Sequence, residues 1–182
     1  MKKVIISLLL CMMSISISYT QRLNMTSGVS EAADEVVFTK KLGFSTFDMS
    51  SFGMSGHIIT VTLGVDGVSG TPKEFGFDFT GNGNFVSIVF MRNDPALVAG
   101  TYNIASFESA GDGSVLAGFP AMDGNGNWGS VWGTVADNKA SDVQITGGVV
   151  KVSVNGGVYT IEMDAKTGSG AEIKAKFTGK LE

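Results

Sequence analysis

The C-terminal part of the chain alternates hydrophobic and polar residues over three consecutive runs between Val149 and Leu181. A period of two residues is typical of strands with one buried face, because successive side chains point to opposite sides of a sheet. Glycine-containing turns separate the runs at Asn155-Gly156 and at residues 167–170. The pattern therefore predicts a three-stranded antiparallel β-meander.

The two turns also predict a register. Asn155-Gly156 suits a two-residue type I′ hairpin, since both residues reach positive φ at low cost, and this turn pairs Val154 with Gly157 and Val152 with Tyr159. For the second turn, only a five-residue loop keeps the hydrophobic side chains on one face, because a slip by one residue would reverse both faces. The resulting register predicts three pairs of opposite charge: Lys166 with Glu172, Asp164 with Lys174, and Glu162 with Lys176.

Shorter runs of the same kind precede the meander. We expect strands over residues 36–42, 57–66, 85–92, 100–104 and 115–119, a loop over residues 44–56, and a further strand with Trp128 and Trp132 on one face. The run 85–92 is hydrophobic on both faces, which is typical of a strand covered on both sides. With 25 glycines, 12 phenylalanines and only 3 prolines, and without a helical hydrophobic period, the chain is predicted to be all-β.

Residues 1–20 predict a secretory signal peptide, because Met1-Lys2-Lys3 is followed by a short hydrophobic run and a serine-rich stretch that ends at Thr20. The hydrophobic run is too short to span a bilayer. Cys11 is the only cysteine, and Leu10 before it disfavours lipidation, which needs a small residue there; a lipidated or uncleaved N-terminus remains the alternative. We expect a flexible leader over residues 21–35 and a single β-domain over residues 36–182.

The charge and composition of the chain limit its possible binding partners. Without Lys2 and Lys3, the chain has 11 basic and 17 acidic residues and hence a net charge of −6. Nucleic acid is an unfavourable partner for such a surface. Loss of Cys11 with the signal peptide would leave no thiol for a disulfide, a metal or a covalent intermediate, which is compatible with an oxidising compartment.

Four aromatic residues are candidates for ligand contact. Trp128, Trp132 and Tyr102 could form a platform for sugars or line an apolar pocket, since aromatic rings offer a large contact area. Phe77 belongs to a stripe of alternating phenylalanines that could line the cavity of a carrier. Core packing is the favoured interpretation of Trp128, Trp132 and Tyr102.

A calcium site is a weaker candidate. Asp123, Asn125 and Asn127 alternate with glycines, as oxygen ligands do in calcium loops. However, the sixth position of such a loop is Trp128 instead of glycine, and the twelfth is Thr134 instead of glutamate. A simple turn is therefore the favoured interpretation, and we expect no bound metal or cofactor.

The residues needed for catalysis do not form a recognisable set. His57 is the only histidine, and it could act as a general base only beside a nucleophile and an orienting group. Asp78, between Phe77 and Phe79, is the carboxylate best suited to glycosidase chemistry, which requires a second carboxylate at a defined distance. An outward position on a strand is the alternative for Asp78.

The order of several motifs resembles a broad group of secreted or lipid-anchored β-domain proteins of Bacteroidetes. The motifs are Gly100-Thr101-Tyr102, Ile145-Thr146-Gly147-Gly148 followed by Val150 and Val152, Gly157-Val158-Tyr159-Thr160-Ile161, and Phe177-Thr178-Gly179-Lys180-Leu181. The resemblance covers about residues 57–181. It implies an antiparallel β-sandwich or a calycin-like barrel, of about 8–10 strands, on the exported side of the inner membrane, and it carries no catalytic residues.

We therefore expect an exported, non-enzymatic binding module of the cell envelope, in the periplasm, at the outer-membrane surface or outside the cell. Its partner would be a glycan, a peptide or another envelope protein. A lipocalin-like carrier of a small apolar ligand is the first alternative, and it requires an enclosed cavity. A glycan-acting hydrolase that uses Asp78 and a second acid is the other.

Overall fold

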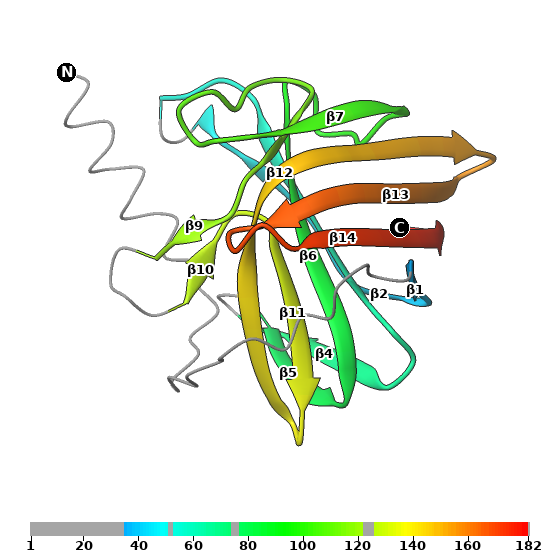
Figure 1. Cartoon of the computed structure of the whole chain (residues 1–182). Coiled ribbons are helices and arrows are strands. Elements are labelled where there is room, and N and C mark those ends of the chain that lie inside the picture. The colour runs from blue at the N-terminus through cyan, green and yellow to red at the C-terminus, as the bar shows by residue number, and fades with distance from the viewer. Residues whose placement is uncertain (1–34, 51–52, 74–76, 122–125, 182) are drawn as a thin grey trace.

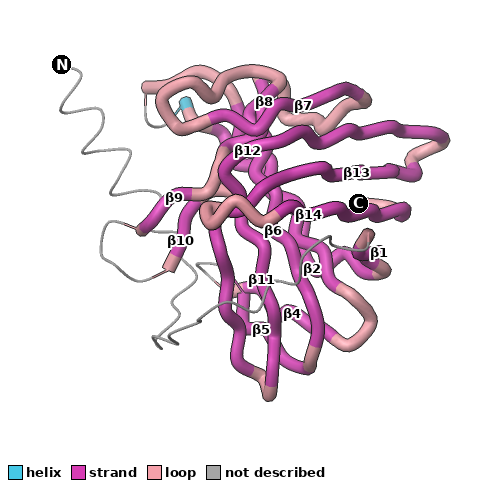
Figure 2. The backbone as a smooth tube through the Cα atoms, in the orientation of Figure 1, coloured by secondary structure: helices cyan, strands magenta, loops and turns pink. Residues whose placement is uncertain are grey.

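The computed structural model describes residues 35–50, 53–73, 77–121 and 126–181. The described residues form strands and connecting turns and contain no α-helix (Figures 1 and 2). The predicted all-β class is thereby confirmed.

Fourteen strands occur in the described part of the chain. Ten belong to one sheet, β9 and β10 form a separate hairpin, and β4 and β5 form another. In chain order the strands are β1 (Val36–Phe38), β2 (Lys40–Asp48), β3 (His57–Gly64), β4 (Val68–Pro72), β5 (Phe77–Gly81), β6 (Gly83–Arg92), β7 (Gly100–Ala105), β8 (Ser114–Leu116), β9 (Phe119–Pro120), β10 (Asn127–Trp128), β11 (Val131–Ala136), β12 (Lys139–Asn155), β13 (Val158–Thr167) and β14 (Glu172–Gly179).

The large sheet closes on itself in part. Its order is β1-β14-β13-β12-β7-β8-β6-β3-β2, and β11 pairs with both β12 and β6. The pairings of β12, β7, β8, β6 and β11 thus return to their starting strand and close a five-stranded barrel, from which the other strands extend. Two pairs of strands are parallel, β1 with β14 and β7 with β8, whereas the other pairings are antiparallel, as expected.

A buried serine lies where β8 and β11 meet along β6. Ser130 is fully buried, and its Oγ accepts a hydrogen bond of 3.0 Å from the backbone N–H of Val89. Its own N–H donates to the carbonyl of Leu116, and its carbonyl accepts from the N–H of Ile145. One residue therefore joins β6, β8 and β12 at the point where the ladder of the sheet branches.

The 17-residue strand β12 bends to serve two parts of the sheet. Its first part pairs with β11 as far as Gln144, and its second part pairs with β7 from Val149. Between them, Gly148 has φ of 118°, and a Cβ there would overlap the carbonyl oxygen of Asp164. Glycine allows this conformation because it lacks a Cβ. Figure 1 shows β12 turning from the direction of β11 to that of β7.

The predicted meander is present as β12, β13 and β14. All three charge pairs are confirmed: Lys166 opposes Glu172, Asp164 opposes Lys174, and Glu162 opposes Lys176. The first turn was placed wrongly, because Gly156 and Gly157, with φ of 57° and 80°, form it, and Val154 pairs with Tyr159. The register differs from the prediction by two residues, which leaves every side chain on its predicted face.

The expected loop over residues 44–56 is wrong in its first part, since residues 44–48 continue β2. This strand pairs with β3 over its length, while β1, separated from it only by Thr39, pairs with β14. The segment 36–48 therefore connects β14 to β3. No residue of β2 is buried, so its sequence carries little of the alternation that marks the other strands.

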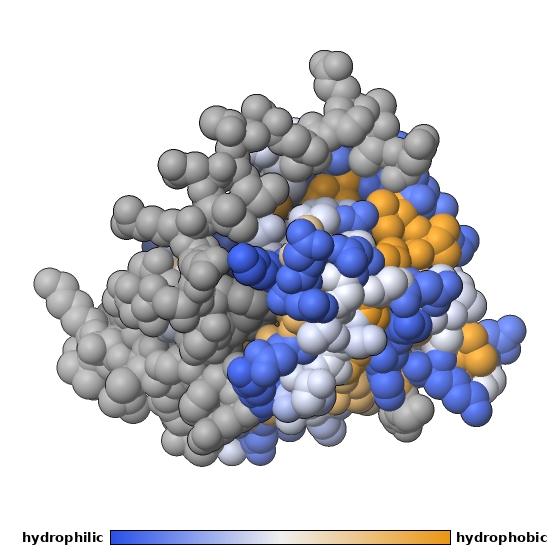
Figure 3. Space-filling view, turned by 90° about the horizontal axis from the view of Figure 1, so that it is seen from below, coloured by the Kyte–Doolittle hydropathy of each residue, from blue (hydrophilic) through white to orange (hydrophobic). Residues whose placement is uncertain are grey.

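The hydrophobic core is formed mainly by side chains from the strands of the large sheet. Its main cluster includes Phe38, Ile59, Phe90, Leu97 and Phe177 together with other hydrophobic residues, and a second cluster gathers around Phe79 and Phe85 under the β4–β5 hairpin. Residues 85–90 of β6 are all buried, which confirms that this strand is covered on both sides. On the face shown in Figure 3, hydrophobic residues form small patches between hydrophilic ones.

Residues 93–99, here called the capping loop, pack onto this core. Leu97 is buried in the main cluster at 3% exposure, whereas its neighbour Val98 is 42% exposed. The hydroxyl of Tyr102 donates to the carbonyl of Val98 at 2.7 Å, and the hydroxyl of Tyr159 donates to the carbonyl of Leu97 at 3.3 Å. Two tyrosines on different strands therefore fix the loop over the barrel.

Candidate binding surface

Three aromatic side chains form a contiguous group, here called the aromatic cluster, beside the β9–β10 hairpin. The rings of Phe107 and Phe119 meet edge to face with centroids 5.8 Å apart, and those of Phe119 and Trp128 do so at 5.9 Å. Phe107 is 36% exposed, Phe119 is half-buried and Trp128 is buried. The cluster thus runs from an exposed ring to a buried one.

Local sequence explains the position of the hairpin. Phe119 pairs directly with Trp128, which places both rings on one face. At its base, Gly118 and Gly129 cross at close range: a Cβ on Gly118 would overlap the carbonyl oxygen of Ser130, and a Cβ on Gly129, which has φ of 75°, would overlap that of Ala117. Two glycines are therefore required for the hairpin to leave the sheet at this point.

A tight turn presents Phe107. The N–H groups of Ser109 and Ala110 donate to the carbonyl of Ser106 at 2.9 Å and 2.8 Å, and the hydroxyls of Ser106 and Ser109 are 2.9 Å apart. These bonds fix the backbone on both sides of Phe107. The exposed ring is therefore attached to an ordered turn.

Polar side chains attach the hairpin to β12, and we call this group, Asn127, Asp142 and Gln144, the hairpin junction. The amide nitrogen of Asn127 donates to Oδ1 of Asp142 at 2.7 Å and to its carbonyl oxygen at 3.3 Å. The amide oxygen of Asn127 accepts from Nε2 of Gln144 at 2.8 Å. Burial raises the pKa of Asp142, and the hydrogen bond from Asn127 only partly opposes this effect.

The structure separates the aromatic residues that the sequence had grouped. Trp128 lies in β10, whereas Trp132 lies in β11 with its ring against Phe38 at 5.5 Å, so the expectation that both tryptophans share one face of one strand is wrong. Tyr102 is 2% exposed in the main core, and Phe77 packs beside Phe79. Of the four candidates, only Trp128 belongs to the aromatic cluster.

Two members of the cluster were missed by the sequence analysis. Phe107 and Phe119 lie in segments without clear alternation, and their contact with each other and with Trp128 depends on the fold. Pairing of a two-residue strand gives almost no periodic signal. The only local hint was the position of Phe119 between Gly118 and Pro120.

The calcium candidates are only partly described. Asp123 and Asn125 lie outside the described residues, and the side-chain amide of Asn127 is hydrogen-bonded at both ends within the hairpin junction. Among the described residues, no three His, Cys, Asp or Glu side chains lie close enough together to hold a metal ion.

The candidate catalytic residues have structural partners. Nδ1 of His57 lies 3.0 Å from the carbonyl oxygen of Asn93, which is a backbone group and not a nucleophile. Asp78 is exposed on β5 and forms an ion pair of 2.6 Å with Lys73, so it occupies the outward position given as its alternative. Asp48, opposite His57, has its pKa lowered mainly by the backbone N–H of Ser50.

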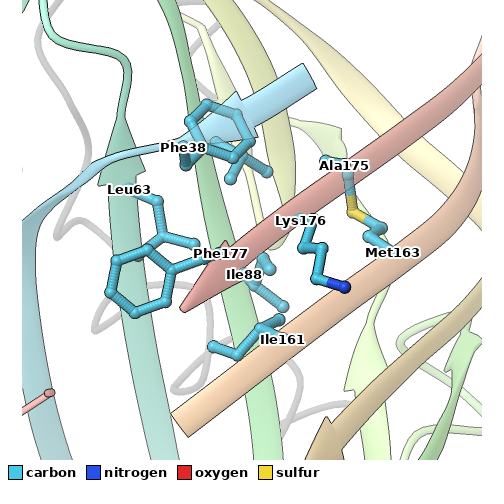
Figure 4. Close-up of a pocket in the computed structure, with 9 residues that line it drawn as sticks. Phe38, Leu63, Ile88, Ile161, Met163, Ala175, Lys176 and Phe177 are labelled. Carbon is cyan, nitrogen blue, oxygen red and sulfur yellow. The ribbon is translucent and has the colours of Figure 1, made fainter. Parts of the chain in front are cut away.

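A small pocket in the core is lined by residues of β1, β3, β6, β13 and β14 (Figure 4). Its lining includes Phe38, Leu63, Ile88, Ile161 and Phe177, and these side chains leave essentially no room for a water-sized molecule. Pockets for drug-sized ligands usually have about 300–1,000 Å³. The space between these side chains is therefore small for a carrier site.

Comparisons of the chain with protein-family models, with curated proteins and with solved structures found no match. The part of the chain that the structure describes contains no helix able to span a membrane.

Proposed function

We propose that this protein is an exported, non-enzymatic binding module that recognises a glycan through the aromatic cluster. The observation that carries the proposal is the edge-to-face row of Phe107, Phe119 and Trp128, in which a 36% exposed ring is supported by two further rings. Aromatic faces provide a large, rigid contact area for the apolar faces of sugar rings. The predicted signal peptide supports export, and the resemblance to secreted Bacteroidetes domains supports a place in the cell envelope.

The alternatives receive less support. A carrier would need more room than the pocket among the described residues offers, because its lining side chains leave essentially no space even for a water-sized molecule. A hydrolase would need Asp78 and a second carboxylate in one cleft, but Asp78 is exposed and paired with Lys73. In the test described next, the absence of binding to any polysaccharide fragment would instead favour a peptide or an envelope protein as the partner.

The test is a titration of the protein with soluble polysaccharide fragments from cell envelopes and from plants. Tryptophan fluorescence and calorimetry measure the binding. Removal of the exposed ring in Phe107→Ala should weaken binding by about 2- to 10-fold, since an aromatic contact contributes about 0.5–1.5 kcal/mol. Val154→Ala is the matched control, because Val154 is 38% exposed on the β12–β13 hairpin. Binding that is unaffected by Phe107→Ala, or that Val154→Ala weakens equally, would refute the proposed surface.

A further inference from the structure

The β9–β10 hairpin has little backbone attachment to the rest of the sheet. Each of its strands contains two residues, and they pair only with each other. A two-stranded hairpin is at best marginally stable without side-chain packing. Its position on β12 therefore depends strongly on side chains, and Asn127 supplies hydrogen bonds to β12 from the hairpin.

The hairpin junction leaves one buried oxygen without a partner. Oδ1 of Asp142 accepts from Asn127, whereas Oδ2 of Asp142 is inaccessible to solvent and has no hydrogen-bond partner among the described residues. An ionised carboxylate has about four acceptor sites, and a buried charge with few partners is strongly unfavourable. A protonated carboxyl group fits this environment better.

Burial, and not a neighbouring charge, sets this preference. Strands β9, β10 and β11 carry no titratable side chain. Two other strands that contact β12 carry charged groups. On β5, exposed Asp78 is paired with Lys73. On β13, exposed Lys166 lies opposite Gly147 and near Glu172, and Lys139 at the start of β12 is also exposed. Asp123 lies outside the described residues, so it has to be tested separately.

We propose that the hairpin junction is a protonation-sensitive latch that holds the β9–β10 hairpin, and with it Phe119 and Trp128, against β12. Protonated Asp142 is better tolerated in the closed junction, because Asn127 satisfies Oδ1 and a neutral carboxyl group loses less hydration on burial than a carboxylate. Ionised Asp142 requires hydration that the closed junction excludes, so opening of the hairpin accompanies ionisation. This inference concerns the hairpin alone and does not depend on glycan binding.

Nuclear magnetic resonance of the whole protein tests the latch. The side-chain carboxyl carbon of Asp142 should titrate with a midpoint above the ordinary aspartate value of 3.8. The indole N–H of Trp128 and the side-chain amide of Asn127 should shift with the same midpoint. As the pH rises, hydrogen exchange of the backbone amides of Phe119 and Trp128 should become faster than in Asp142→Asn at the same pH. The acceleration should reach up to about tenfold for each unit by which the pKa of Asp142 is raised.

Two variants complete the design. In Asp142→Asn, the signals of Trp128 and Asn127 should no longer depend on pH, whereas Asp123→Asn should behave as the unmodified protein does. An ordinary midpoint for Asp142, unchanged Trp128 signals across the titration, or a dependence abolished by Asp123→Asn instead would each overturn the latch. The titration of Asp142 itself needs no variant, so poor folding of Asp142→Asn would still leave a decisive measurement.

Discussion

Asn82 and Asn138 each cap the backbone of the other's turn. Oδ1 of Asn82 accepts from the N–H of Asp137 at 2.9 Å, and Oδ1 of Asn138 accepts from the N–H of Gly81 at 2.7 Å. The two turns connect β5 to β6 and β11 to β12, and β6 pairs with β11. This reciprocal pair therefore closes one end of the sheet.

Two substitutions of Asn138 should distinguish how much its side-chain hydrogen bond and its backbone conformation each contribute to the free energy of unfolding. Asn138 has φ of 60°, which Asn and Gly tolerate better than other residues. Asn138→Gly should lower the free energy of unfolding by about 1 kcal/mol through the lost hydrogen bond, and Asn138→Ala should lower it by about 1–2 kcal/mol more through strain. Urea denaturation measures both values. Equal stability of the two variants would contradict the assigned strain.

Ser130 should be among the most sensitive polar positions. Ser130→Ala removes the acceptor of the buried Val89 N–H, and an unsatisfied buried donor costs about 1–3 kcal/mol. The exposed Ser153 on the same sheet provides the control, since surface substitutions usually change stability by about 0.5 kcal/mol or less. Similar midpoints of denaturation for Ser130→Ala and Ser153→Ala would show that the branch point does not depend on this bond.

The meander shows how much of the fold can be predicted. Its polar and hydrophobic faces fixed the pairing of Asp164 with Lys174, because a slip by one residue would bury charges. The same rule cannot detect a slip by two residues, which keeps each face intact. Asn155-Gly156-Gly157 offers two adjacent turns, and only the paired strands show that the glycines at 156 and 157 are used.

The candidate surface was less predictable, for a related reason. Trp128 and Trp132 have the spacing of one strand face, but Gly129 and Ser130 divert the chain from the hairpin to β11. Phe107 reaches the cluster from a turn that has no periodic pattern. Contacts of this kind depend on long-range packing, which a single sequence does not encode locally.

Leu97 should anchor the capping loop. It is buried at 3% exposure in the main core, and replacement of a buried leucine by alanine typically costs about 2–5 kcal/mol. Leu97→Ala should therefore lower the melting temperature clearly, whereas Val98→Ala, at the 42% exposed neighbouring position, should have little effect. Calorimetric scans of both variants make the comparison. Equal shifts would mean that Leu97 adds no more to stability than its exposed neighbour.

Asp142 should make stability decrease as the pH rises. Burial raises its pKa in the folded protein above the ordinary value of 3.8, so the folded state binds more protons than the unfolded state between these two values. Its contribution is fully present below pH 3.8 and is lost as the pH rises through the folded pKa. Urea denaturation at a series of pH values should show the unmodified protein losing stability relative to Asp142→Asn from acid to neutral pH. If the difference in the free energy of unfolding between the two proteins is constant with pH, Asp142 is hydrated in the folded protein. If the difference changes with pH in the opposite direction, its carboxylate has a cationic partner.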